Sequence, residues 1–364
     1  MNFGRLVPIT VLALLLTGCA AFTEDPEPTD LARGADGTLE VYASFYPLQF
    51  LTEEIGGDRV TVSALTPPGV DPHNVELSPR TVTEMGSASL VVYLSGFQPA
   101  VDDGVTATGA RAFDAAEHTE LLASGNGHDH DHGDDGAHSD DHGADDTHED
   151  HGADDMHGDH ADHAHEDHDG AGPAAVDTSA SEDDHSDHDH GPLDPHFWLD
   201  PLRLAEVGEA LATELGELDP DGAPTYAENL AGLTDELTAL DEELQTGLAQ
   251  CERDTIVVAH EAYGYLTEEH GLRQEGVAGI DPESDPSPAR LVEIGEVVQT
   301  YDVDTIFVET LASPRIIEAL AEDLGVQTAV LDPLENQQDD SADYLDVMRA
   351  NLAALQDALD CETA

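Results

Sequence analysis

Apolar and polar positions in the first third of this chain follow the spacings of strands and helices in turn. Short apolar runs favour buried strands, and apolar residues at three- and four-residue steps favour helices that pack by one face. Strands are expected over 39–45, 60–65, 89–96 and, more weakly, 110–116, with helices over 47–57 and 78–88. Ser78 before Pro79 is an N-cap pattern that begins a helix. The alternation predicts a parallel sheet covered by helices.

The same alternation returns in the last third of the chain. Strands are expected over 255–259, 272–279, 303–309 and 326–331, and helices over 261–271, 287–302, 313–325 and 341–359. Between the two parts, apolar residues recur at helical spacing without interruption, at Tyr226, Leu230, Leu233, Leu237, Leu240 and Leu244. The pattern predicts an N-terminal α/β lobe over 38–223 and a C-terminal α/β lobe over 251–364, joined by one long rigid helix over 224–250.

The segment 125–191 has neither pattern and interrupts the N-terminal lobe. It holds 15 of the 20 histidines in a background of Asp and Glu, with almost no large apolar residue. Such a segment cannot bury enough surface to offset its chain entropy, so we expect a disordered insertion when no metal is bound. It is either a solvated charged loop or a set of weak metal sites that raises the local zinc concentration and passes ions to the folded protein.

The N-terminus has the features of an exported lipoprotein. Arg5 precedes a short apolar run over 6–16, which predicts a signal peptide over 1–18 rather than a membrane-spanning helix. Leu-Thr-Gly-Cys at 16–19 resembles a lipobox, in which Cys19 would be lipidated, although a plain secretory signal with an incidental cysteine is the alternative. Residues 19–37 are then a lipidated N-terminus and tether, so the membrane is reached by a lipid anchor only.

The charge of the chain limits the partners that it can bind, and its cysteines indicate the compartment. The chain has 80 acidic residues against 11 basic ones, all arginine, and a net charge of −69. This charge excludes nucleic acid and anionic membrane surfaces as partners, and it suits either a saline environment or the attraction of cations. Cys251 and Cys361 would form a disulfide in an oxidising compartment, or remain two free buried thiols.

Polar residues at the ends of the predicted strands are the candidate site, because open α/β sheets bind ligands beyond the carboxyl ends of their strands. His73, His196, His260 and Asp332 stand at such positions, and Glu309 is a secondary candidate. Any one of these histidines alone could simply bond a neighbouring backbone group. Three imidazoles with one carboxylate are a tetrahedral Zn²⁺ set, although raw affinity also favours Cu²⁺ and Ni²⁺. The Asp two residues before His73 and before His196 could orient the imidazole.

Four segments carry a resemblance to a known family. They are TPPGVDPHNVELSP, LDPHFWLDP, VVAHEAYGYL and VLDPL, in this order. Together they resemble the zinc/manganese ABC-transporter solute-binding lipoproteins. The resemblance implies two α/β lobes joined by a rigid helix with one metal between them, bound by His73, His196, His260 and Asp332. It also favours zinc, because manganese and iron members commonly have Glu where this chain has His260.

These observations lead to a functional expectation. The protein is expected to be a monomer, lipid-anchored outside the cytoplasmic membrane, that captures Zn²⁺ between its lobes and delivers it to an ABC permease. The alternatives are a manganese-binding homologue, or a surface adhesin or zinc buffer of the same family. A zinc enzyme is not expected, because a protein carboxylate fills the fourth metal position and no HExxH motif accompanies the histidines.

Overall fold

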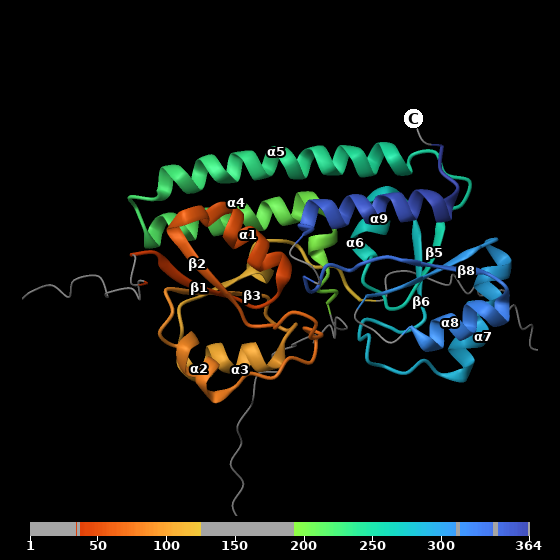
Figure 1. Ribbon diagram of the computed structural model, residues 1–364, viewed down its shortest axis with the longest axis horizontal. Coiled ribbons are helices and arrows are strands. Elements are labelled where there is room, and N and C mark those ends of the chain that lie inside the picture. The colour runs from red at the N-terminus through yellow and green to blue at the C-terminus, as the bar shows by residue number, and fades with distance from the viewer. Residues whose placement is uncertain (1–33, 35–36, 125–192, 311–313, 338–340, 363–364) are drawn as a thin grey trace, which may run out of the picture. The chain divides into compact units, whose positions relative to one another are not determined.

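A computed structural model describes residues 34, 37–124, 193–310, 314–337 and 341–362 (Figure 1). The predicted signal peptide, Cys19, nearly all of the tether and the histidine-rich insertion lie outside the described residues. In the described part of the chain, no helix is both long enough and apolar enough to cross a membrane.

The N-terminal lobe has a parallel sheet in which the described strands follow the order β2-β1-β3-β4. The strands are β1 (Leu39–Ala43), β2 (Val60–Ala64), β3 (Leu90–Tyr93) and β4 (Ala112–Asp114). The helices are α1 (Tyr46–Gly56), α2 (Pro79–Met85), α3 (Pro99–Thr108) and α4 (Pro201–Leu218). Ser78 caps α2 as expected, since its side chain accepts a hydrogen bond from the N–H of Thr81. The sequence pattern did not predict α3.

The C-terminal lobe repeats this topology, with a parallel sheet in the order β6-β5-β7-β8. Its strands are β5 (Thr255–Val258), β6 (Arg273–Gly276), β7 (Thr305–Val308) and β8 (Gln327–Val330). Its helices are α6 (Gly264–His270), α7 (Pro288–Thr300), α8 (Arg315–Leu324) and α9 (Tyr344–Leu359). Two parallel α/β lobes flanked by helices are the fold class that the sequence predicts, which confirms that prediction.

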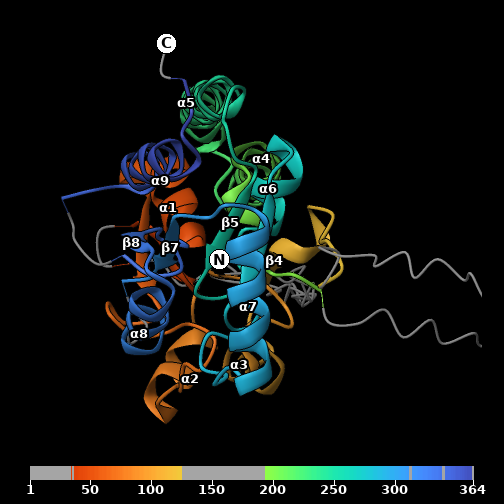
Figure 2. The ribbon, with the colours of Figure 1, turned by 90° about the vertical axis from the view of Figure 1, so that its right-hand side faces the viewer.

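Alternating strand residues face two different cores. In β5, Ile256 and Val258 belong to the largest apolar core, whereas Val257 faces a smaller one together with Ile306 and residues of α7 and α8. Figure 2 shows α9 and α5 on one side of this lobe and α7 and α8 on the other. Both faces of the sheet are therefore covered, as a parallel sheet requires.

The long helix α5 (Ala223–Leu248) contacts both lobes. It packs along α4 and α1 of the N-terminal lobe and along α9 of the C-terminal lobe (Figure 1). Its 26 residues span roughly 39 Å at 1.5 Å per residue. Buried leucines of α5 share one continuous apolar core with residues of both lobes, so relative movement of the lobes would disrupt that packing.

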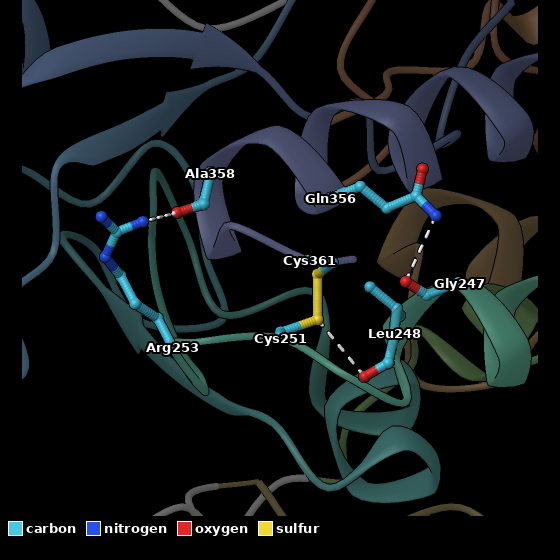
Figure 3. The surroundings of a disulfide bond; sticks show 7 residues. All are labelled: Gly247, Leu248, Cys251, Arg253, Gln356, Ala358 and Cys361. Carbon is cyan, nitrogen blue, oxygen red and sulfur yellow. Dashed lines mark hydrogen bonds between the residues drawn. A yellow bond between two sulfur atoms is a disulfide. The ribbon is translucent and has the colours of Figure 1, made fainter. Parts of the chain in front are cut away.

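The end of α9 is fastened to the segment that follows α5 (Figure 3). A disulfide joins Cys251 to Cys361. Beside it, Arg253 donates to the carbonyl oxygen of Ala358 at 2.9 Å, and Gln356 donates to that of Gly247 at 3.2 Å. The disulfide and the hydrogen bonds thus hold the end of α9 against the end of α5 and the residues that follow it.

Candidate metal site

His196 is fixed by a short segment that precedes α4. Its backbone N–H and its Nδ1 both donate to Oδ1 of Asp194, at 3.0 and 2.7 Å. The residues that follow, Phe197, Trp198 and Leu199, form one fully buried 3₁₀ turn. Because one carboxylate oxygen binds both the ring and the backbone of His196, the imidazole has little rotational freedom and presents Nε2 to the cleft.

His260 is fixed in the same manner at the carboxyl end of β5. Its backbone N–H and Nδ1 lie 3.2 and 2.6 Å from Oε1 of Glu309, which follows β7. His260 is fully buried, and Glu309 is 8% exposed. Glu309 was a secondary candidate ligand from the sequence. In the structure it contacts Nδ1 of His260, on the opposite side of the ring from Nε2, and so orients this histidine.

His73 lies on the connection between β2 and α2 and is more loosely held. Its backbone N–H donates to Oδ1 of Asp71 at 2.8 Å, and its ring packs edge-on against Phe97, with 4.7 Å between ring centroids. Its side chain is 10% exposed, whereas those of His196 and His260 are fully buried. His73 is thus the histidine of this group nearest to solvent.

The carboxylate that meets the three histidines is Glu335. Asp332, the carboxylate ligand expected from the sequence, is not part of this group. Asp332 uses Oδ1 to accept the N–H of Leu334 at 2.8 Å, while its Oδ2 accepts from Thr310. Leu334 has a φ of +60°, in the left-handed region. The Asp332 side chain therefore forms the turn, and the turn directs Glu335 into the cleft.

The four side chains converge on one point. Oε1 of Glu335 lies 3.1 Å from Nε2 of His73, 3.1 Å from Nε2 of His196 and 3.2 Å from Nε2 of His260. The two Nε2 atoms of His196 and His260 are 3.4 Å apart. Ligands bonded to zinc at 2.0–2.1 Å in a tetrahedron are separated by about 3.3 Å. These four separations are close to that length, and the ligand atoms of all four residues lie within 4.8 Å of one another, so the cluster could hold a single Zn²⁺ ion at its centre.

The protonation of the rings supports the same interpretation. Nδ1 of His196 and of His260 must carry a proton, because its partner is a carboxylate oxygen. In the neutral imidazole Nε2 then has a lone pair, which would face the carboxylate of Glu335. Lone pairs and a carboxylate at such distances repel each other unless a cation or a proton lies between them.

Without a metal, protons supply that positive charge. Burial lowers the pKa of His260, but Glu309 and Glu335 outweigh this effect and raise the pKa to about 10. Burial also opposes protonation of His196, yet Asp194 and Glu335 raise its pKa. Burial raises the pKa of Glu335, but hydrogen bonds from His196 and His260 and the charge of His260 hold it well below its usual range. The metal-free cluster is therefore an ion pair, and a binding metal has to displace protons from it.

A cavity of about 420 Å³ opens beside the cluster. Its walls include Asp71, Glu283, Asp285, Glu309 and Glu335, together with Ile316 and Ile317. Acidic walls lower the energy of a cation that approaches the cluster and raise its local concentration.

The chain as a whole is similar to known proteins. The family described as ZnuA, zinc-uptake complex component A, periplasmic, matches residues 41–358. The zinc-binding lipoprotein AdcA of Streptococcus pneumoniae is 29% identical over 338 residues, which are 90% of this chain and 57% of that protein. The chain thus spans just over half the length of that relative. The high-affinity zinc uptake system protein ZnuA of Bacillus subtilis is also 29% identical, over 88% of each chain.

Solved structures show the same fold. The laminin-binding protein Lmb of Streptococcus agalactiae, described as bifunctional with adhesin and metal transporting activity, superposes with a TM-score of 0.67. It is 27% identical, over 88% of this chain and 99% of that one. Zn(II)-bound AdcA of S. pneumoniae superposes with a TM-score of 0.65 at 25% identity, over 90% of this chain and 59% of that one.

Proposed function

The chain belongs to the family of zinc-uptake complex component A, and from this premise we propose that it is the extracytoplasmic zinc-binding component of an ABC importer. The members of this family are solute-binding proteins, so the chain is not an enzyme. The observation that carries the proposal is the convergence of three Nε2 atoms and one carboxylate oxygen within 4.8 Å of one another, with the carboxylate oxygen 3.1–3.2 Å from each nitrogen, close to the edge of a zinc tetrahedron.

Each residue of the cluster has a separate role in this proposal. His196 and His260, each held at Nδ1 by a carboxylate, present preoriented Nε2 lone pairs from the two lobes. Glu335 supplies the negative charge that partly neutralises Zn²⁺, and His73 closes the site on its more exposed side. Three nitrogen ligands favour zinc over the harder Mn²⁺. Bound zinc is then passed to a membrane permease, while Cys19 anchors the protein by a lipid outside the cytoplasmic membrane.

The choice between the two neighbouring carboxylates gives the sharpest test. We expect Glu335→Gln to weaken zinc binding about a hundredfold or more, because roughly a quarter of a zinc-site free energy of about 10–16 kcal/mol is lost. Asp332→Asn is the matched control, since an Asn side chain also caps this turn, and it should leave the affinity within a few-fold of that of the native protein. Calorimetry with a competing chelator measures both. Equal losses in the two variants would refute the assignment of Glu335.

A second candidate function is adhesion, because the similar Lmb protein is described as an adhesin that also transports metal. Binding of the purified protein to immobilised laminin would test it. If Glu335→Gln binds laminin as well as the native protein does, adhesion is independent of the metal site. If neither protein binds laminin, this candidate is excluded and the zinc proposal is untouched.

A further inference from the structure

Asn336, the residue after Glu335, contacts the opposite lobe through its whole side-chain amide. It is 7% exposed. Its Oδ1 accepts the N–H of Gly69 at 2.9 Å, and its Nδ2 donates to the carbonyl oxygens of Pro67 and Val70, both at 2.9 Å. All three bonds run from the C-terminal lobe to four consecutive residues of the N-terminal lobe, 67–70, which we call the cleft loop.

The cleft loop leads directly to His73, and a second amide holds its base. Gln98 is 1% exposed, and its Nε2 donates to Oγ1 of Thr66 at 2.9 Å and to the carbonyl oxygen of Pro72 at 3.1 Å. Gln98 belongs to the N-terminal lobe, so it holds the two ends of the loop on the lobe from which the loop comes. Asn336 holds the tip of the same loop on the other lobe. The two amides therefore have different functions, because the bonds of Asn336 cross the cleft and those of Gln98 do not.

The contact of Glu335 with His73 and the contact of Asn336 with the cleft loop both depend on the same turn of the chain. The left-handed conformation of Leu334 directs Glu335 and Asn336 together toward the N-terminal lobe. Glu335 reaches Nε2 of His73 at 3.1 Å, and Asn336 reaches the loop that carries His73. A movement that withdraws the cleft loop from Asn336 would also withdraw His73 from the cluster.

We infer that Asn336 is a positioning residue that fastens the cleft loop across the site and thereby slows the release of zinc. The inference rests on the proposed function in taking Zn²⁺ as the cargo. Residues 67–70 are all exposed, so water can solvate their backbone groups when the loop opens. Opening then exchanges three protein hydrogen bonds for bonds to water, which costs a modest free energy and makes the closure reversible.

The test compares Asn336→Leu with the native protein in stopped-flow release of Zn²⁺ to an excess of a chromophoric chelator. Leucine is of similar size and makes no hydrogen bond. Loss of these three hydrogen bonds should raise the release rate by about ten- to a hundredfold, with the association rate nearly unchanged. Asn229→Leu is the matched control, because Asn229 bonds the carbonyl oxygen of Ile55 at 3.0 Å away from the cleft loop. Its release rate should stay at the native value.

Coupling to His73 separates positioning from a merely structural role. In a His73→Ala background the loop carries no ligand, so adding Asn336→Leu should change the release rate by less than about threefold. If Asn336→Leu accelerates release equally with and without His73, or not at all while the native protein binds zinc, the inference fails although the zinc proposal stands. If the native protein binds no zinc, the proposed function itself fails.

A measurement on the native protein covers the case in which Asn336→Leu does not fold. The N–H of Gly69 is on an exposed residue and donates to Asn336, so its exchange with solvent reports this contact directly. We expect slow exchange in the zinc-loaded protein and exchange at least about tenfold faster after zinc is removed by a chelator. Fast exchange of this N–H in the zinc-loaded protein would overturn the inference.

Discussion

The two lobes have the same strand order, and each supplies one fully buried histidine to the site, yet they hold that histidine differently. In the N-terminal lobe the supporting carboxylate is local, because Asp194 is two residues before His196. In the C-terminal lobe it comes from the neighbouring strand, because Glu309 follows β7 while His260 follows β5. A local turn and a contact between strands thus reach the same geometry, with Nδ1 bonded and Nε2 free to bind a cation.

The remaining two members of the cluster differ more. The N-terminal lobe contributes His73 on an exposed connection, and the C-terminal lobe contributes the buried anion, Glu335. The two supported histidines form a rigid base between the lobes, whereas His73 and Glu335 meet across the cleft. We therefore expect both lobes to contribute to zinc affinity, and zinc release to begin at the exposed side.

Removal of a buried histidine should have the largest effect. His196→Ala and His260→Ala should each weaken zinc binding by roughly 10²- to 10³-fold, because each loses about a quarter of the free energy of a four-ligand site. Competition calorimetry would measure both. His118→Ala is the control, because His118 is exposed and stacks on Phe113 outside the cluster. A large loss in only one of the two buried variants would contradict a contribution from both lobes.

Replacing the supporting carboxylates should have the next largest effect and should distinguish the lobes. Asp194→Asn and Glu309→Gln keep an acceptor for Nδ1 but remove the charge that makes the imidazole more basic. We expect about a tenfold loss of affinity for Asp194→Asn, whose histidine is also positioned by the buried turn that follows it. For Glu309→Gln we expect a loss closer to a hundredfold, because its contact is the one that joins β7 to His260.

Glu275 of the C-terminal lobe provides a control for the removal of a buried negative charge outside the cluster. Glu275 is 7% exposed and pairs with Arg290 at 3.0 Å, away from the cluster. Glu275→Gln should bind zinc like the native protein in the same calorimetric assay. Equal losses for Asp194→Asn and Glu309→Gln would show that the origin of the carboxylate does not matter.

Most of the fold followed from the spacing of apolar residues, because buried strands and one-sided helices require it. The exception, α3, contains Gly104 and several β-branched residues, which have low helix propensity. It is stabilised by packing instead, since Val101 lies in the same core as Met85. Such tertiary stabilisation has no local signal in the sequence. The family indicated by the four sequence segments is confirmed by the family match over residues 41–358.

The site was predicted less completely than the fold, because three similar Asp-Pro pairs were not interpreted in the same way. Asp71, Asp194 and Asp332 each precede a proline, and the carboxylate of each accepts the N–H of the residue two positions later. These Asp-Pro pairs are turns that aim the following side chains. From the sequence alone, the first two are expected to support histidines and the third to be a ligand. Had Asp332 been interpreted consistently as a turn residue, Glu335 would have been the next carboxylate able to reach the cleft.

The pH dependence of binding should be dominated by the C-terminal lobe. The raised pKa of about 10 means that metal-free His260 stays protonated from its ordinary pKa of about 6.5 up to about 10, so zinc must displace a proton throughout this window. Apparent affinity should therefore rise about tenfold per pH unit for each displaced proton and level off above pH 10. Calorimetry in buffers of different ionisation enthalpy would count the released protons.

The raised pKa of His260 also determines how the stability of the metal-free protein changes with pH. A raised histidine pKa stabilises the fold fully below about pH 6.5, and this contribution is lost as pH rises through about 10. Glu309→Gln removes the main charge that raises this pKa, so it should flatten both pH profiles, while Asp194→Asn should leave the part due to His260 in place. A zinc affinity that does not change between pH 7 and pH 9 in the native protein would refute the protonated cluster.

The disulfide should have the smallest effect on binding, and it marks a last difference between the lobes. It closes a loop of 110 residues in the C-terminal lobe, whereas the remaining cysteine, Cys19, precedes the N-terminal lobe. We expect the double variant Cys251→Ser with Cys361→Ser to lose about 2–4 kcal/mol of unfolding free energy in guanidinium titrations. Zinc affinity should stay within about twofold, because the continuous core along α5 and the hydrogen bonds from Arg253 and Gln356 still hold the lobes. If affinity instead fell as far as in the histidine variants, the disulfide rather than α5 would set the distance between the two halves of the site.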